Sequence, residues 1–203
     1  IGKPQSKQWD EESGWTFRNH NWYGQRIIPS LFKRLKLPQG ENMKFVQKMV
    51  DLHMRPIALS EDIVTDSAVR RLLFDAGDDI DALMMLCESD ITSNNKEKVK
   101  HFLDNFELVR KKLIEVEEKD RIRKFQPPID GHEIMHIFDL QPCSIIGELK
   151  IQIKDAILDG IIENNHEEAL QLLYKLAAEN GLTPVNPPLT AEEREINSKK
   201  QEA

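Results

Sequence analysis

A long amphipathic stretch near the middle of the chain constrains the fold more than any other feature. Its apolar residues recur at three- and four-residue steps, which is the spacing of one face of an α-helix. The stretch predicts a helix of about 25 residues. The helix must end at Phe125-Gln126-Pro127-Pro128, because neither proline can donate a backbone hydrogen bond, and we expect a domain boundary there. The apolar stripe consists of Val99, Phe102, Leu103, Phe106, Val109, Leu113 and Val116.

Shorter helical patterns precede this stretch. They cover 22–35, 43–53, 65–76 and 80–87. Pro38 and Gly40 should end the first pattern, and Pro56 should end the second. Either Thr65 or Asp66 can cap the third, and Gly77 should terminate it.

Three short helices are expected after the boundary, over about 132–139, 144–158 and 166–178. Ser144 and Asn165 should cap the last two, and Gly181 should close the third. No strand-like alternation persists anywhere in the sequence, so the predicted fold class is all-α. We expect a helical bundle over 1–98, a long connecting helix over 99–126, a small three-helix domain over 127–182 and a disordered tail over 183–203.

Composition limits the location and the partners of the chain. Its 203 residues are 39% hydrophobic and 31% charged, and no apolar run approaches the roughly 20 residues of a membrane span. The two cysteines, Cys87 and Cys143, cannot form a disulfide framework, which favours a reducing, cytoplasmic location. The net charge of −7 argues against indiscriminate binding of polyanions, and we expect neither membrane nor DNA partners.

Residues 132–136 read His-Glu-Ile-Met-His, which matches the zinc-peptidase motif in letters. Histidines four residues apart share a helix face and can both bind zinc, while the glutamate activates water. Gly131 and Pro142 limit this helix to about two turns, and nothing fixes a third ligand downstream. We therefore favour a structural interpretation, in which His132 starts a helix and His136 lines a small core. The downstream ligand candidates are His166, Glu167 and Glu168.

A series of short stretches follows in fixed order along the chain. They read Ile-Gly-Lys-Pro at 1–4, Trp-Thr-Phe-Arg-Asn-His-Asn at 15–21, Phe-Lys-Arg-Leu-Lys at 32–36, Asp-Leu-His at 51–53, Asp-Ser-Ala-Val-Arg-Arg-Leu at 66–72, Pro-Ile-Asp-Gly-His-Glu-Ile-Met at 128–135, Leu-Gln-Pro at 140–142, Ile-Gly at 146–147, Leu-Asp-Gly at 158–160 and Glu-Glu-Ala-Leu at 167–170. In order and spacing they resemble the C-terminal half of bacterial tRNA nucleotidyltransferases, the CCA-adding enzymes and their poly(A) polymerase relatives. The sequence departs from that family at Asp139-Leu140 and at Cys143, where Gly-Leu and Gly are usual.

The resemblance implies the body and tail of such an enzyme without its catalytic head. In this family the head transfers CMP and AMP from CTP and ATP to the tRNA 3′ end, using paired carboxylates that hold Mg ions. No Asp-x-Asp on a strand is found here. Asp78-Asp79-Ile80-Asp81 has the letters but lies at an expected helix start, where acids favour the helix dipole. We therefore expect none of these residues to catalyse nucleotide transfer, and the chain alone to be inactive.

The resemblance also implies that the first bundle is a truncated HD domain, a phosphohydrolase fold that holds a divalent metal through histidines and aspartates. The family's first His and its His-Asp doublet would precede the first residue, so the chain reads as one cut within a metal motif. His20, His53 and Asp90 remain as implied ligands of an incomplete site for Mn, Ni or Co. The alternative function is a metal-dependent HD phosphohydrolase acting on phosphomonoesters or cyclic phosphodiesters. His101 and His166 are expected on the surface.

The long helix is the expected site of RNA binding. Residues 96–125 carry ten Lys or Arg and seven Asp or Glu, in a chain that is acidic elsewhere. Contacts from lysine and arginine to phosphates give salt-dependent binding with little sequence preference, which suits a protein that grips tRNA. The competing interpretation is a solvated helix face with Glu–Lys pairing. The candidate RNA contacts are Arg110, Lys111, Lys112, Arg121, Arg123 and Lys124, together with Arg70 and Arg71.

Overall fold

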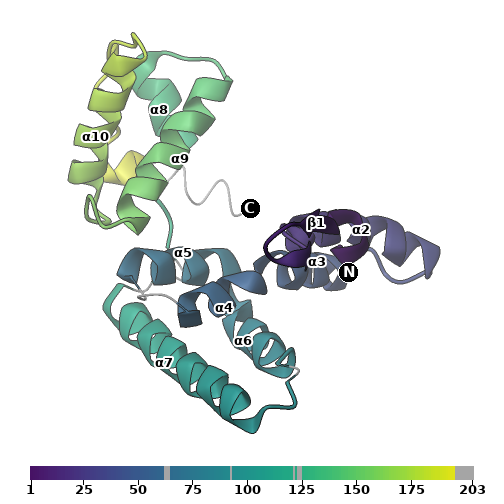
Figure 1. Cartoon of the computed structure of the whole chain (residues 1–203). Coiled ribbons are helices and arrows are strands. Elements are labelled where there is room, and N and C mark those ends of the chain that lie inside the picture. The colour runs from purple at the N-terminus through teal and green to yellow at the C-terminus, as the bar shows by residue number, and fades with distance from the viewer. Residues whose placement is uncertain (62–64, 92, 121, 123–124, 195–203) are drawn as a thin grey trace. The chain divides into compact units, whose positions relative to one another are not determined.

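A computed structural model describes residues 1–61, 65–91, 93–120, 122 and 125–194 of the chain. It is mostly helical, with one small two-stranded hairpin (Figure 1). The chain forms two compact units, Ile1–Lys124 and Phe125–Ala203, and each is described by itself. The predicted helical character is confirmed, and the hairpin is the exception to the all-α prediction.

The hairpin corrects the expectation that the sequence forms no strand. β1 (Gln8–Asp10) pairs antiparallel with β2 (Gly14–Thr16), and Trp9 lies opposite Trp15. The Asp10 carboxylate holds the turn by accepting hydrogen bonds from two backbone N–H groups within it. Strands of three residues are too short to show a persistent alternation of apolar and polar residues, so the sequence carries no periodic signal for them.

The next two helices, α2 (His20–Arg34) and α3 (Glu41–Leu52), pack closely against each other. Their contact depends on Gly24, because a Cβ at that position would lie 2.7 Å from a side-chain carbon of α3. The Asn21 side chain donates a hydrogen bond to the backbone oxygen of Asp51 at 2.9 Å. The start of α2 is therefore held beside the end of α3.

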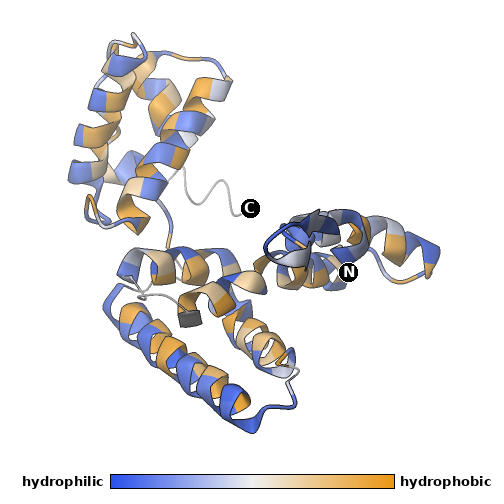
Figure 2. Cartoon of the chain, in the orientation of Figure 1, coloured by the Kyte–Doolittle hydropathy of each residue, from blue (hydrophilic) through white to orange (hydrophobic). Residues whose placement is uncertain are grey.

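The long helix α7 (Lys96–Asp120) packs against three other helices of the first unit. It has 25 residues, which confirms the predicted length, and hydrophobic residues recur along it (Figure 2). Its buried side chains belong to the predicted stripe, so α7 is part of the first unit and not a separate connection. Neither α7 nor any other helix in the described ranges is long and apolar enough to cross a membrane. The other elements of this unit are α1 (Lys3–Ser6), α4 (Met54–Glu61), α5 (Asp66–Ala76), the 3₁₀ turn η1 (Gly77–Asp79) and α6 (Ile80–Ser89).

Two of the predicted helix ends in this unit are confirmed and one is wrong. The Thr65 hydroxyl accepts a hydrogen bond from the Ala68 N–H and caps α5. Gly77 ends α5 with a positive φ of 56°. Pro56, by contrast, does not stop a helix, because α3 already ends at Leu52 and Pro56 lies in the first turn of α4. In a first turn the missing N–H of proline removes no intrahelical hydrogen bond.

The second unit contains the helices α8 (Gly131–Phe138), α9 (Ser144–Leu158) and α10 (His166–Glu179). The Asn165 side chain accepts a hydrogen bond from the Glu168 N–H and caps α10, as predicted. The predicted Ser144 cap is wrong. Ser144 is the first residue of α9, and the residue at the N-cap is Cys143, which makes no side-chain cap.

The segment 183–203, expected to be a disordered tail, is hydrogen bonded at its start. The backbone N–H groups of Val185 and Asn186 donate to the Ile137 oxygen at 2.7 and 3.0 Å. The Asn186 side chain also donates to the His136 oxygen at 2.8 Å. Backbone bonds of this kind leave no mark in composition, and residues 195–203 lie outside the described part of the chain.

Candidate metal centre

His20 opens α2 directly after the hairpin, and its ring is fixed by the backbone that precedes it. The Phe17 oxygen lies 3.3 Å from the backbone nitrogen of His20 and 2.9 Å from its ring Nδ1 atom. Asn19 has a left-handed backbone with φ 59°, which turns the chain into the helix. The Nε2 atom of His20 consequently faces the end of α3.

His53 follows the last residue of α3 and is fixed in the same manner. Its Nδ1 atom lies 2.7 Å from the Val50 oxygen, and its backbone nitrogen donates to the Met49 oxygen at 3.1 Å. The thiol of Cys87, on α6, donates a hydrogen bond to the backbone oxygen of His53 at 3.1 Å. Both the ring and the backbone of His53 are therefore held by neighbours within the first unit.

The two imidazole rings meet at their Nε2 atoms, which are 3.1 Å apart. A carbonyl oxygen can only accept a hydrogen bond, so each Nδ1 atom carries the proton that its carbonyl contact requires. In two neutral rings both Nε2 atoms then carry lone pairs, which repel at this distance. A shared proton or a cation between the two nitrogens would relieve this repulsion. Histidines that bind metals are commonly held through their other ring nitrogen by a backbone carbonyl, as both are here.

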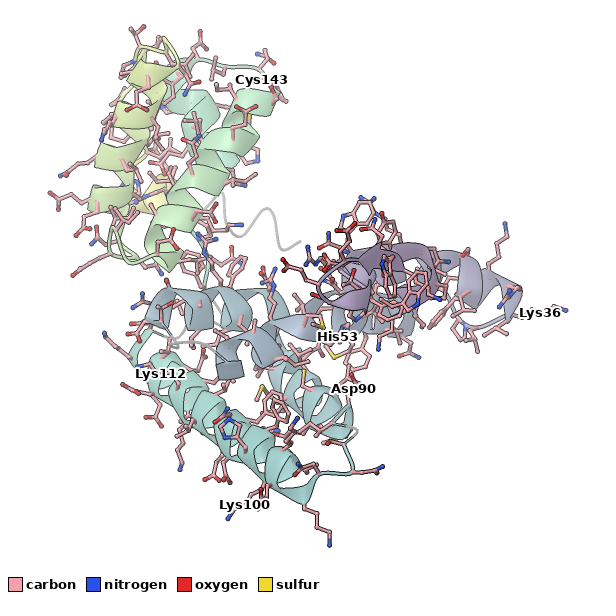
Figure 3. The ribbon with its side chains drawn as sticks, viewed as in Figure 1. Lys36, His53, Asp90, Lys100, Lys112 and Cys143 are labelled. Atoms are coloured by element: carbon pink, nitrogen blue, oxygen red, sulfur yellow. The ribbon has the colours of Figure 1, made fainter. Side chains whose placement is uncertain are left out.

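The pair lines a pocket of about 210 Å³ in the first unit. Asp90, the residue at the end of α6, lines the same pocket, and so does Lys3 of α1. Figure 3 labels His53 and Asp90, which come from the ends of α3 and α6. The three residues that the resemblance implies as ligands, His20 among them, therefore line one pocket. The other lining residues are Ile1, Val50, Leu86 and Cys87.

The electrostatics of the pocket favour a neutral His53. Burial lowers its pKa, and the charges of His20 and Lys3 act in the same direction, whereas the hydrogen bond to the Val50 oxygen and the Asp90 carboxylate act in the opposite direction. The lone pair of His53 is thus available near neutral pH. Burial also raises the pKa of the Cys87 thiol to about 12, which keeps it protonated and unsuited to bind a metal as a thiolate.

The residues of the pocket fit a divalent cation in part. Two imidazole nitrogens suit Mn, Ni or Co, and the Asp90 carboxylate offers an oxygen ligand at the pocket wall. Within the described ranges, however, no three His, Cys, Asp or Glu side chains lie close enough to form a ligand set by themselves. The arrangement is a two-histidine half-site formed by His20 and His53.

The described candidate RNA contacts on and near α7 are held by carboxylates. The ion pairs are Arg110–Glu88 (2.7 Å), Lys111–Glu107 (3.0 Å), Lys112–Asp66 (2.9 Å) and Arg70–Asp120 (2.7 Å). This pattern matches the competing interpretation of an ion-paired helix face, because an RNA phosphate must displace a carboxylate to reach these cations. Arg71 lines a different pocket, of about 450 Å³. Arg121, Arg123 and Lys124 lie outside the described residues.

The His-Glu-Ile-Met-His run is engaged in an internal contact. His132 and His136 are both exposed, so the prediction that His136 lines a core is wrong. The run has two buried residues, Ile134 and the charged Glu133, which is 1% exposed. The Glu133 carboxylate accepts a hydrogen bond from Nε2 of His166 at 2.8 Å. His166 was expected on the surface and instead joins α10 to α8, whereas His101 is exposed as predicted.

The run Asp78-Asp79-Ile80-Asp81 also serves a structural contact. The Lys48 ammonium donates to the Asp79 carboxylate at 2.6 Å and links α3 to η1. This contact agrees with the prediction that the run is structural.

Two features of these sites escape sequence reasoning. Lys3 was not singled out, although it belongs to the stretch at 1–4 that resembles the family's metal motif. The Glu133–His166 pair has no sequence signal, because its partners lie 33 residues apart on different helices.

Neither a family model, nor a curated protein, nor a solved structure matches this chain. Its function must therefore be inferred from the pocket and from the residues around it.

Proposed function

We propose that this chain is the RNA-binding body of a tRNA nucleotidyltransferase and carries an incomplete HD-type metal pocket. One observation carries the proposal. The sequence resemblance names His20, His53 and Asp90, which are far apart in the chain, and all three line the same pocket with the two Nε2 atoms 3.1 Å apart. Residues chosen without regard to such a family would have no reason to meet in this way.

In this proposal the side chains of the pocket divide into two roles. His20 and His53 hold the cation through Nε2, and the carbonyl contacts of their Nδ1 atoms keep the rings oriented. A divalent cation would there polarise a phosphate ester. Lys3 lines the pocket and offers an ammonium group to the same phosphate, while Asp90 offers a carboxylate.

The transfer of CMP and AMP to the tRNA 3′ end, with Mg, CTP and ATP, is assigned to a part of the protein outside these residues. The role of this chain is then to hold tRNA. The cations near α7 remain the proposed phosphate contacts, and binding at Lys112 or Arg110 would exchange a carboxylate partner for a phosphate.

A second candidate function, a metal-dependent HD phosphohydrolase, is favoured by the presence of Lys3 beside the histidine pair. A cation and an ammonium group in one small pocket suit the phosphate of a phosphomonoester or of a cyclic phosphodiester. The proposed substrates are small phosphate esters, since the pocket is only about 210 Å³ in volume.

The two functions differ in their RNA requirement. We expect the 203-residue chain to bind tRNA saturably, with weaker binding at 200 mM than at 50 mM salt, as phosphate contacts require. Equal binding to tRNA and to an unstructured RNA of the same length would contradict the tRNA function.

The phosphohydrolase function predicts release of phosphate from p-nitrophenyl phosphate or opening of 2′,3′-cyclic AMP in the presence of Mn or Ni. That activity should be lost in His53→Gln, and its absence from the unaltered chain would remove this second function.

A further inference from the structure

The three tryptophans of the chain lie within its first 22 residues, and all three are exposed. Trp9, Trp15 and Trp22 retain 63%, 55% and 42% of their accessible surface. A tryptophan side chain has one of the largest apolar surfaces of any residue, and its burial removes much apolar surface from water, which is favourable in free energy. Three uncovered indoles within 22 residues of sequence therefore indicate apolar surface that a partner could cover.

The first two indoles form a cross-strand pair on the hairpin. The ring centroids of Trp9 and Trp15 are 5.2 Å apart in an edge-to-face arrangement. Such a pair stabilises a hairpin by itself. It does not need a cation, yet the Lys7 ammonium lies 4.1 Å from the centre of the Trp15 ring.

A second aromatic pair, of one tryptophan and one tyrosine, lies in the first turn of α2. Trp22 and Tyr23 lie edge to face with centroids 4.8 Å apart, and Tyr23 is 38% exposed. The guanidinium carbon of Arg26, one helical turn further on, lies 3.4 Å from the centre of the Trp22 ring. Each exposed aromatic pair thus carries one cation against an indole.

The charge of this end of the chain is opposite to that of the rest. Residues 1–40 contain seven Lys or Arg and three Asp or Glu, whereas the whole chain contains 28 and 35. The Asp10 carboxylate accepts hydrogen bonds from backbone N–H groups of the hairpin turn, and the two other acids, Glu11 and Glu12, are residues of that turn. In the described part of the chain neither Lys7 nor Arg26 takes part in an ion pair, which distinguishes them from the paired cations of α7.

We propose that these residues form a binding surface for single-stranded RNA, here called the aromatic–basic surface. Unpaired bases stack on exposed aromatic rings, and phosphates pair with nearby cations, which is the recognition chemistry that this surface offers. The choice of RNA as the nucleic acid rests on the proposed function, and the inference deepens that function by naming where an unpaired strand is held. The surface consists of Lys7, Trp9, Trp15, Trp22, Tyr23 and Arg26.

Intrinsic fluorescence tests the proposal directly, because the chain has no tryptophan outside the aromatic–basic surface. We expect a 12-nucleotide oligouridylate to quench the tryptophan fluorescence of the 203-residue chain saturably. Binding should weaken between 50 and 200 mM salt. A 12-base-pair RNA duplex should quench far less, because its bases are already stacked on one another.

Substitutions identify the contacts. In Trp9→Leu/Trp15→Leu the hairpin keeps an apolar cross-strand pair but loses both indoles. We therefore expect the dissociation constant of a labelled oligouridylate, measured by fluorescence anisotropy, to rise at least roughly tenfold. Phe45→Leu is the matched control, since Phe45 is also an exposed aromatic residue of the first unit but lies outside the surface. Lys7→Gln keeps every aromatic ring and should reduce both the affinity and its salt dependence, even if the double variant misfolds.

Three results would overturn the inference. They are an absence of quenching by oligouridylate, equal affinity in Trp9→Leu/Trp15→Leu, and quenching by phosphatidylglycerol vesicles without quenching by RNA, which would point to a membrane surface. The inference and the proposed function fail separately. If the double variant holds tRNA as well as the unaltered chain does, the inference fails and the tRNA function stands. If oligouridylate binds to the aromatic–basic surface but tRNA binds no better than unstructured RNA, the inference stands and the tRNA function fails.

Discussion

In each unit of the molecule a histidine ring contacts an ionisable side chain of another helix or helix end, and the two contacts differ in whether a proton donor faces an acceptor. In the first unit His20 faces His53, and in the second His166 faces Glu133, with the partners 33 residues apart in both cases. The carboxylate of Glu133 accepts a hydrogen bond from the ring N–H of His166, so this pair has one donor and one acceptor. The His20–His53 pair brings two acceptor nitrogens together and is complete only with a proton or a cation between them. The first pair is therefore expected to serve binding, and the second to serve stability.

The largest effect is expected from removing Glu133. It is 1% exposed, and Glu133→Ala leaves a cavity in α8 and deprives His166 of its partner. Loss of this buried side chain and of its hydrogen bond, with the cavity that remains, should lower the free energy of unfolding of the second unit by about 3 kcal/mol. Faster amide hydrogen exchange in α8 and α10 measures this loss. His136→Ala changes an exposed residue of the same run and should cost less than about 0.5 kcal/mol; equal losses in the two variants would refute the structural role of Glu133.

The next effect concerns cation binding at the first pair. His53→Gln removes one of two nitrogen ligands, and we expect Ni or Mn to bind at least about a hundredfold more weakly, since loss of even an indirect partner costs ten- to a hundredfold. Isothermal titration calorimetry measures the dissociation constant of the metal for the unaltered chain and for the variant. His101→Gln is the matched control, because His101 is an exposed histidine of the same unit. If His101→Gln lost as much affinity as His53→Gln, the ions would be binding to surface histidines.

A smaller effect separates stability from binding. Without added metal, His53→Gln should change the free energy of unfolding of the first unit by less than about 1 kcal/mol, because it removes a repulsion between lone pairs together with one hydrogen bond. Tryptophan fluorescence follows this unit, since all three tryptophans lie in it. Added Ni at a hundredfold excess over its dissociation constant should stabilise the unaltered chain by about 2.7 kcal/mol and the variant much less. A large loss of stability in the metal-free variant would make the pair structural.

The smallest effect is expected at the exposed Lys112–Asp66 pair, which sets the baseline for both histidine pairs. A hydrogen bond from the Lys112 ammonium lowers the pKa of Asp66 below its usual range. A carboxylate with a lowered pKa contributes stability above its ordinary pKa of about 3.9 and loses that contribution as the pH falls through the lowered value. Lys112→Gln should therefore be slightly less stable than the unaltered chain at pH 7 and equal to it in strong acid, as urea unfolding would show. A difference that persisted unchanged in acid would exclude the ion pair as its cause.

The sequence predicted the helices that periodicity or capping specifies. The stripe from Val99 to Val116 gave the length of α7, and Thr65 and Asn165 cap the helices that they were expected to cap. The hairpin at 8–16 was missed because each strand is only three residues long. The hydrogen bonds of residue 185 to α8 were missed because they involve only the backbone.

The candidate sites show the same division between local and distant information. His20, His53 and Asp90 could be named because the resemblance supplies a spacing that periodicity alone does not, and the structure brings all three to one pocket. The partners of the basic residues on α7 could not be named, since Glu88 and Asp66 belong to other helices. The His-Glu-Ile-Met-His run matches a motif in which the histidines bind zinc. In the structure its histidines are exposed, and the glutamate is the buried charged residue.

The central claim is that the two Nε2 atoms of His20 and His53 hold one cation between them. Crystals of the chain soaked in Ni and measured at the Ni absorption edge test it most directly. The account predicts one strong anomalous peak within bonding distance of both Nε2 atoms, and no such peak in His53→Gln crystals treated in the same way. An absence of density between the two rings, or a peak only at the exposed His132 and His136, would contradict it.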